Sequence, residues 1–323
     1  MANNTQHELD QIRENAAFAP LNDRAFLRIT GSDATRWLNG MVTNSIQSLA
    51  PGEGNYNFLL NAQGRIQGDC TIYRDGDEFL LETSANQVEA IQRHLDHFII
   101  MDDVELSPDY TEKQGLLLLG PKASTILSEL GLPTLDPLRL IHVESTHGSV
   151  LLITPSVGSV ARYELWADAA AIASLRDAAA GTTEVSAIAL EHLRLLDATP
   201  RFGQDIRDRD LPQETAQTHA LHFSKGCYLG QEIVERIRSR GQVHRTFTAF
   251  RLTPDTEPAG SEALPTLPAP LEANGKAVGE LTSAALIPLP EGPTLFALGY
   301  VRREALETHQ PLTYSGGSVT RSS

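Results

Sequence analysis

The chain has 323 residues, 41% of them hydrophobic, which is enough for two or three packed units with sizeable cores. Its formal net charge of -15 and its pI near 5.1 exclude a broad, nonspecific attraction to nucleic acid or to an anionic membrane, because the average field repels phosphate. Residues 1–20 carry several charges and no apolar run of the length that a signal peptide or a membrane span requires. We therefore expect a cytoplasmic protein with a flexible lead-in over residues 1–20.

Apolar periodicity predicts helices and strands in irregular alternation. Helices are expected over residues 32–41, from residue 86 onward, and over residues 121–130, 168–180 and 188–197. Strands are expected over residues 56–60, 65–73, 78–82, 116–119, 150–154 and 160–166. This order favours an α+β fold over a doubly wound parallel sheet, and neither a dinucleotide nor a P-loop glycine motif is present.

The last quarter of the chain has a different residue pattern, rich in strand-like segments and proline. Strand-like segments over residues 246–252, 276–286 and 294–301 are separated by a stretch that contains Pro254, Pro258, Pro265, Pro268 and Pro270. The pattern predicts a small C-terminal β-barrel over residues 243–314 with one long irregular loop. Residues 315–323 are expected to form a flexible tail.

The most informative segment is a glycine-flanked turn that leads into a helix. It reads Lys225-Gly226-Cys227-Tyr228-Leu229-Gly230-Gln231-Glu232, and an apolar stripe continues from it to Gly241. Cys227 then lies just before a helix N-terminus and two residues from Lys225, and both features favour the thiolate. The pattern predicts a nucleophilic or metal-binding cysteine, with a small buried apolar cysteine as the structural alternative.

Cysteine usage limits the metal chemistry of the chain. Cys70 and Cys227 are its two cysteines, too few for a disulfide framework or for the four ligands of most iron–sulfur clusters. A metal site formed by His219, His222 and Cys227 matches no regular structural zinc spacing. We therefore expect no resident metal and no permanent cluster held by this chain alone.

A basic cluster follows the turn. Arg236, Arg238, Arg240 and Arg245 stand together in an otherwise acidic chain, where they could attract the acidic tail of a ligand or an acidic partner surface. The alternative is that they simply complement the negative end of the helix that follows the turn.

On the turn motif the chain resembles the YgfZ family, a relative of the glycine-cleavage T-protein, because residues 225–232 match K-G-C-[FY]-x-G-Q-E at every fixed position. Segments L-N-G-M-V-T-N at 38–44, R-F-G-Q-D at 201–205 and L-P-Q-E at 211–214 are similar to T-protein segments in the expected order. The resemblance implies a three-lobed fold, with a folate-binding region over residues 21–242 and tetrahydrofolate or a one-carbon derivative in a central cavity. It also implies a factor that supports iron–sulfur client enzymes, including tRNA-modifying ones, or their assembly factors, with Cys227 and Lys225 as functional residues.

The same resemblance assigns Asp69 to the folate site. T-proteins carry an Asp-Asp pair on a strand, and in this sequence Gly68 replaces the first member while Asp69 keeps the second. Strand alternation places Asp69 opposite Cys70, so Asp69 faces either a polar cavity or solvent.

Two further folate contacts are implied. Glu164 keeps the place of a glutamate that follows G-Y-T-G-E in T-proteins and clamps the pterin, although the rest of that motif is absent. Arg194 lies in Leu193-Arg194-Leu195, which resembles the start of the T-protein segment L-R-L-E-A-G. The structural alternatives are an exposed glutamate on an edge strand and an exposed helix arginine.

Three functions remain open at this point. A folate-binding maintenance factor fits the turn motif best, while the broken Asp-Asp pair and the missing G-Y-T-G-E disfavour a true aminomethyltransferase. A folate-linked demethylase and a non-catalytic binding module stay as alternatives, so enzymatic activity is left undecided. No direct nucleic-acid or membrane partner is expected.

Overall fold

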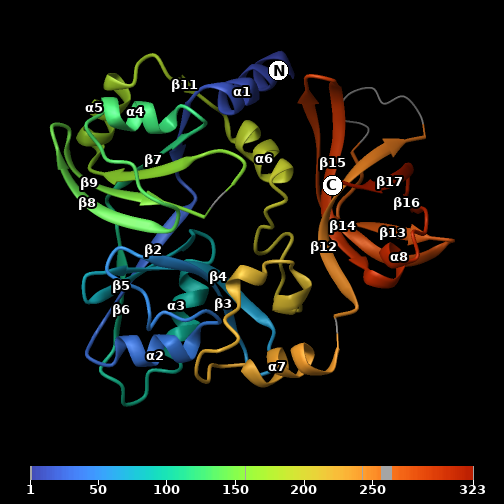
Figure 1. Ribbon diagram of the computed structural model, residues 1–323, viewed down its shortest axis with the longest axis horizontal. Coiled ribbons are helices and arrows are strands. Elements are labelled where there is room, and N and C mark those ends of the chain that lie inside the picture. Colours follow the sequence, from blue (N-terminus) through green and yellow to red (C-terminus); the bar gives the residue numbers. More distant parts are fainter. Residues whose placement is uncertain (1, 157, 242, 256–263, 323) are drawn as a thin grey trace.

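The computed structural model describes residues 2–156, 158–241, 243–255 and 264–322, except for the side chains of residues 2, 3 and 240. The described chain forms three lobes, two built on sheets and one a barrel (Figure 1). Within these residues no helix is long and apolar enough to cross a membrane.

The first lobe is a six-stranded sheet assembled from both ends of the first two thirds of the chain. Its order is β11-β1-β7-β10-β9-β8, so the N-terminal strand pairs with strands that follow much later in the sequence. The strands and flanking helices are α1 (Ala2–Glu14), β1 (Ala17–Leu21), β7 (Gln114–Leu119), α4 (Ala123–Glu129), β8 (Arg139–Ser145), β9 (Gly148–Thr154), β10 (Arg162–Ala167), α5 (Ala169–Ala178) and β11 (Thr183–Glu184).

Both faces of this sheet are covered, which explains the continuous leucine run over residues 116–119. Leu116 and Leu118 pack with α4 and α5, whereas Leu117 and Leu119 face the opposite side. A strand buried on both faces loses the alternation of polar and apolar residues.

The second lobe is inserted between β1 and β7. Its five-stranded sheet has the order β3-β4-β5-β2-β6 and is covered on one face by two helices, whose Trp37, Leu38, Ile91 and Leu95 complete the core. The elements are β2 (Arg24–Thr30), α2 (Ala34–Met41), β3 (Gly54–Leu60), β4 (Ile66–Asp75), β5 (Glu78–Ser84), α3 (Val88–Asp96) and β6 (Glu105–Asp109).

Helix α6 (Ala187–Leu196) and a long connection carry the chain from the sheets to the barrel. The connection contains two short 3-10 turns, Pro212–Glu214 and Thr218–Ala220, and then α7 (Gln231–Arg240). Helix α7 begins after Gly230, which has a φ of 81°, a left-handed conformation that glycine adopts without strain.

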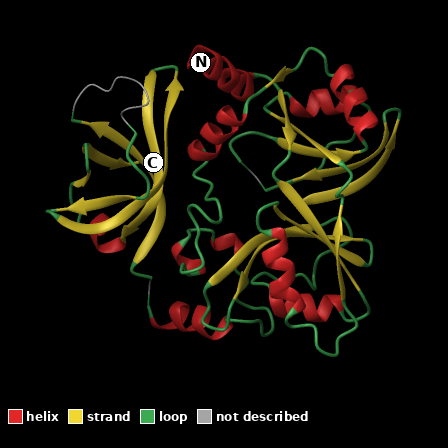
Figure 2. Cartoon of the chain, turned by 180° about the vertical axis from the view of Figure 1, so that it is seen from behind, coloured by secondary structure: helices red, strands yellow, loops and turns green. Residues whose placement is uncertain are grey.

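The predicted barrel is confirmed as a closed sheet of six strands, seen on one side of the molecule in Figures 1 and 2. Its elements are β12 (Arg245–Pro254), β13 (Ala269–Ala273), β14 (Lys276–Leu289), β15 (Gly292–Arg302), α8 (Arg303–Glu307), β16 (Leu312–Tyr314) and β17 (Gly317–Arg321). Strand β13 lies in the proline-rich stretch that was predicted as irregular loop, with the exposed Pro270 between buried Ala269 and Leu271. Residues 256–263, which include Pro258, lie outside the described residues.

Both ends of the chain differ from the prediction. The flexible lead-in predicted over residues 1–20 contains α1 and most of β1, because Leu9 and Ile12 are buried between α6 and the barrel. The flexible tail predicted over residues 315–323 contains β17, which pairs with β12 and β16 and closes the barrel. Neither α1 nor β17 was predicted, because each is mostly polar and contributes only a few apolar residues to a core that it shares with other elements.

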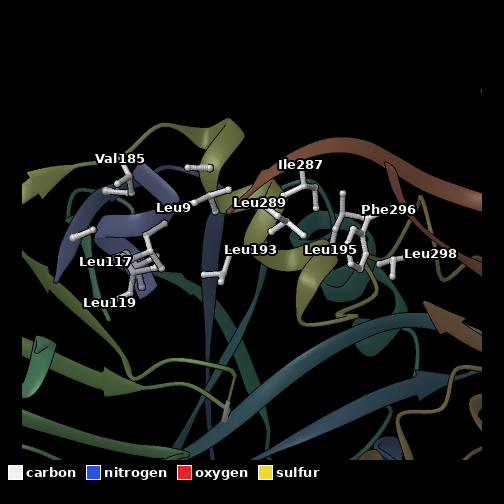
Figure 3. Packing of buried hydrophobic residues seen from close by; sticks show 14 of the residues in the cluster. Leu9, Leu117, Leu119, Val185, Leu193, Leu195, Ile287, Leu289, Phe296 and Leu298 are labelled. Carbon is white, nitrogen blue, oxygen red and sulfur yellow. The ribbon is translucent and has the colours of Figure 1, made fainter. Parts of the chain in front are cut away.

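One apolar cluster joins the N-terminal helix, the six-stranded sheet, α6 and the barrel (Figure 3). Leu9 lies near Leu117 and Leu119, while Leu195 of α6 meets Ile287, Leu289 and Phe296 of the barrel. The first lobe and the barrel are therefore packed against one another through α1 and α6.

We expect Leu9→Ala to lower the free energy of unfolding by about 2–5 kcal/mol, because Leu9 is 1% exposed and its removal leaves a cavity between lobes. His7→Ala, on the exposed side of the same helix, should change it by no more than about 0.5 kcal/mol. Denaturant unfolding measures both. Equal and small effects would mean that α1 does not dock in solution.

Candidate functional site

A cavity of about 320 Å³ lies where the two sheets meet α6 and the loop that follows it. The second lobe supplies Tyr56, Asp69 and Glu82, and the first lobe supplies Glu164. Arg194 contributes from α6. The structure therefore brings the three predicted folate residues, which are far apart in the sequence, to the wall of one cavity.

Asp69 faces this cavity rather than the core. Its strand β4 alternates as predicted, with Ile66, Cys70 and Ile72 buried and Asp69 partly exposed. Tyr56 Oη donates to Asp69 Oδ2 at 2.6 Å, and Gln87 Nε2 donates to Asp69 Oδ1 at 2.8 Å. Two donors fix the carboxylate with one lone pair on each oxygen still directed elsewhere.

Glu164 is buried on the central strand β10, at 5% exposure, and not on an edge strand. Trp166 Nε1 donates to its Oε2 at 3.2 Å, whereas Oε1 has no donor among the described residues. Burial first, and the charge of Glu82 second, raise the pKa of Glu164 to about 8. The side chain is thus an under-satisfied acceptor at the cavity wall.

Arg24 and Glu82 form an ion pair that reduces the free-energy cost of burying negative charge beside Glu164. Arg24 Nε donates to Glu82 Oε1 at 2.6 Å, and the side chain of Glu82 is only 1% exposed. The positive charge of Arg24 also opposes the raised pKa of Glu164. The cavity wall therefore holds two buried glutamates of which one has a direct cationic partner.

Arg194 lines the cavity, but its five N–H groups are all engaged within the protein. Nε and Nη2 donate to Glu191, Nη1 donates to Asp205 Oδ2 and to the carbonyl of Thr199, and Nη2 also donates to Ser283 Oγ. Its side chain is 11% exposed, so the alternative of an exposed helix arginine is wrong, whereas a folate contact stays a prediction. Its contacts make Arg194 a connector between α6 and barrel strand β14.

The sequence analysis missed several residues of the cavity wall. Tyr56 and Arg24 are the most consequential, because they hold Asp69 and Glu82, and His219 stacks on Tyr56 with ring centroids 5.4 Å apart. Tyr56 was predicted at the start of a strand, where the period of two puts it on the same face as Phe58. The pairing of β3 with β4, which sets Phe58 opposite Asp69, brings that face beside Asp69.

Lys225 does not line the cavity. Its ammonium group donates to the carbonyls of Asn39, Val42 and Asn44 at 2.6–2.7 Å, at the C-terminal end of α2. Burial lowers the pKa of Lys225 to about 7, while three acceptors in this geometry favour the ammonium form and the negative end of the helix adds to that preference. Lys225 therefore joins the glycine-flanked turn to the L-N-G-M-V-T-N segment.

Further contacts hold the turn against the second lobe. Tyr228 is buried with Phe58 and Val234, and Leu229 N donates to the carbonyl of Gly40 at 3.0 Å. A side chain on Gly230 would come within 2.5 Å of the Asn61 carbonyl, so only glycine permits this approach. Two of the segments that resemble the T-protein family thus form one packed unit.

The two cysteines lie in opposite environments. Cys227 is exposed on the turn, so the structural alternative of a buried apolar cysteine does not apply to it. Cys70 is 2% exposed in the core of the second lobe, and burial, followed by the charge of Asp69, raises the pKa of its thiol well above the ordinary value. Only Cys227 is accessible to a partner or reagent.

We expect Glu164→Gln to stabilise the ligand-free protein at high pH. A carboxyl whose pKa is raised in the folded state contributes stability below the unfolded pKa of 4.5, and this contribution is lost as the pH rises through about 8. The variant should be more stable by about 1–3 kcal/mol at pH 8.5, and the difference should shrink toward pH 5. Chemical unfolding at the two pH values measures this, with exposed Glu89→Gln as the control. A pH-independent difference would contradict the burial of a charge at Glu164.

Comparison with known proteins adds a family to this geometry. A family model described as the GCVT N-terminal domain matches residues 1–225. The chain is 26% identical to an aminomethyltransferase of Nostoc sp. over 94% of this chain and 82% of that protein. It is 27% identical to the mitochondrial iron-sulfur cluster assembly factor IBA57 homolog of Pyricularia oryzae, over 71% of this chain and 56% of that protein.

The fold is shared over nearly the whole chain. The crystal structure of glycine cleavage system aminomethyltransferase T from Bartonella henselae superposes with a TM-score of 0.82, covering 99% of this chain and 88% of that one at 21% identity. This confirms the predicted α+β, T-protein-like fold with a C-terminal barrel. Because the family model covers more than half of the chain, the chain belongs to the family of the GCVT N-terminal domain.

Proposed function

We propose that this protein is a cytoplasmic, tetrahydrofolate-binding member of its family, of the YgfZ type, that supports the assembly or repair of iron–sulfur enzymes. The observation that carries the proposal is the pairing of a polar central cavity with an exposed cysteine on the K-G-C-Y-L-G-Q-E turn. Client enzymes would include ones that modify tRNA, with the protein itself making no direct nucleic-acid contact. Cys227 would be the reactive group and Lys225 would position it.

The cavity residues fit a reduced folate. A pterin presents a 2-amino group and a ring N–H, and Glu164 offers a carboxylate with one oxygen that accepts no hydrogen bond from the described residues. Asp69, held by Tyr56 and Gln87, would supply a second fixed acceptor. A bound folate supplies carriage of a one-carbon unit, and the protein residues bind and orient it.

Aminomethyl transfer is the second candidate, because several relatives carry the name aminomethyltransferase. The structure gives a reason to rank it lower. Gly68, which replaces the first Asp of the T-protein pair, faces α3, where an added Cβ would meet Ile91 Cγ1 at 2.9 Å and Gln87 Oε1 at 3.3 Å. A carboxylate at this position would be packed against α3 instead of standing in the cavity.

The maintenance role rests on other observations. The chain is similar to relatives named iron-sulfur cluster assembly factor IBA57 homolog, in Pyricularia oryzae and Neurospora crassa. Three carbonyl contacts from Lys225 and the buried Tyr228 fix the turn so that Cys227 stands at the surface. A fixed, exposed thiol outside the folate cavity suits chemistry on a partner protein.

We expect Glu164→Gln to weaken tetrahydrofolate binding by about 1.5–3 kcal/mol, since a hydrogen bond to a charged acceptor is lost with little change of shape. Affinity of the unaltered protein should rise with pH as Glu164 ionises, because the ionised carboxylate accepts from the pterin. Isothermal titration calorimetry with reduced folate measures both effects, with Glu89→Gln as the matched exposed control. Unchanged affinity in Glu164→Gln would remove Glu164 from the site.

We expect Cys227→Ser to keep its fold and its folate affinity but to fail to restore iron–sulfur enzyme activity in cells that lack the native protein. Cys70→Ser, at equal expression, should restore it, because Cys70 is buried in the core and inaccessible to reagents. Alkylation should label Cys227 and leave Cys70 unmodified in the folded protein. Full rescue by Cys227→Ser would favour a plain folate-binding module, and transfer of a methylene group from aminomethyl-lipoyl protein would favour the aminomethyltransferase.

A further inference from the structure

Two open hollows of about 620 and 720 Å³ flank the tip of the β3–β4 hairpin, away from the folate cavity. They adjoin, since Asn61 and Ala62 of the hairpin tip line both. One continues over α3 and the other over α7, so together they form a groove that we call the α3–α7 groove. Its apolar lining comes from Ala62, Ala90, Phe98, Leu229, Ile233 and Ile237.

The charge of this groove is opposite to that of the chain. Arg65, Arg93 and Arg236 line it together with His94 and His97, and no carboxylate of the described residues lines either hollow. Arg93 and Arg236 form no ion pair with any residue that the structure describes. In a protein with a net charge of -15, two unneutralised arginines on one apolar surface create a local field that acts over about 10 Å at 0.1 M salt.

Other arginines of the predicted basic cluster are neutralised. Arg245 pairs with Asp210 and Glu214, and Arg238 lies 3.7 Å from Glu235 and stacks over Phe223. The side chain of Arg240 lies outside the described residues. The structure thus separates Arg236 from the cluster and groups it with Arg65 and Arg93, which the sequence does not suggest.

His94 also lines the groove. Its Nε2 is buried without a hydrogen-bond partner among the described residues, and its ring meets Phe98 edge-on with centroids 5.4 Å apart. Ile100 and Met101, which follow Phe98 closely in the sequence, are 83% and 94% exposed. Large apolar side chains that are exposed together commonly mark a site of interaction with another molecule.

We propose that the α3–α7 groove docks an acidic amphipathic segment of a protein partner. Apolar side chains of the segment would fill the two hollows, and its carboxylates would pair with Arg93 and Arg236. A nucleic acid suits the groove less well, because the aliphatic part of the lining, which includes Leu229, Ile233 and Ile237, offers no ring on which a base can stack. Leu229 belongs both to the groove and to the turn of Cys227, so a docked partner would lie beside that thiol.

The groove shares no lining residue with the folate cavity, so the inference does not depend on the proposed function. A partner could dock whether or not the protein binds folate.

The test uses a fluorescein-labelled helical peptide of about 18 residues, or about five turns, with leucine and phenylalanine on one face and glutamate on the other. Fluorescence anisotropy should show binding that weakens as salt is raised. The double variant Arg93→Glu/Arg236→Glu should bind at least about tenfold more weakly, because two attractive pairs become repulsive. Arg13→Glu, an exposed charge reversal on α1 at the far side of the molecule, should bind as the unaltered protein does (Figure 1).

Several outcomes would overturn the proposal. They are absence of binding, equal binding of a scrambled peptide of the same composition, no effect of the double variant, or tighter groove-dependent binding of an RNA of equal charge. Folate affinity and melting temperature of the double variant should match the unaltered protein, which separates a lost docking site from a lost fold. Hydrogen exchange with the unaltered protein gives a second measurement, since the peptide should protect residues 88–98 and 229–237, and protection elsewhere would contradict the assignment.

Discussion

The junction between α6 and the barrel depends on one buried carboxylate, that of Asp205. The side chain is fully buried and accepts from Arg194 Nη1 at 2.7 Å, from the Arg201 amide at 3.0 Å, and from the hydroxyls of Thr282 and Ser283 at 2.5 and 2.6 Å. These donors come from α6, from the loop after it and from barrel strand β14. A buried charge is tolerated only when it is fully paired and hydrogen-bonded, so the three elements must meet at this geometry.

Asp210, a few residues later, is a second buried carboxylate that joins separate elements. Its carboxylate accepts from Arg245 at 2.6 Å and from the Arg207 amide at 2.8 Å, and its backbone carbonyl accepts from the amide of Ile66 at 3.1 Å. The connection between the sheets and the barrel therefore touches the second lobe and the barrel at once. Because α6 and this connection form one wall of the central cavity, the polar contacts that join these elements also shape the candidate site.

The cavity and the cysteine turn place different demands on the chain. The cavity keeps Glu164 buried and incompletely paired, which stores an energetic penalty that a ligand with N–H donors relieves. The turn is instead held in place by direct contacts. Lys225 donates hydrogen bonds to carbonyls at the end of α2, and Gly230 packs closely against the hairpin tip. Cys227 is exposed on this turn, and Leu229 of the same turn lines the α3–α7 groove. The central cavity and this groove share no lining residue among the residues that the structure describes.

The sequence by itself determined the elements with strong periodicity, the presence of a barrel, and the outward or inward side of β4 that separates Asp69 from Cys70. It also placed Asp69, Glu164 and Arg194 on separate segments that prove to share a cavity. Only the tertiary structure decided that α1 and β17 are ordered, that Arg194 and Lys225 are fully engaged in contacts between segments, and that Arg93 and Arg236 line one groove. The reason is physical. Periodicity reports which face of a segment is buried, whereas hydrogen-bond partners and local charge depend on which distant segments the fold brings within a few ångströms.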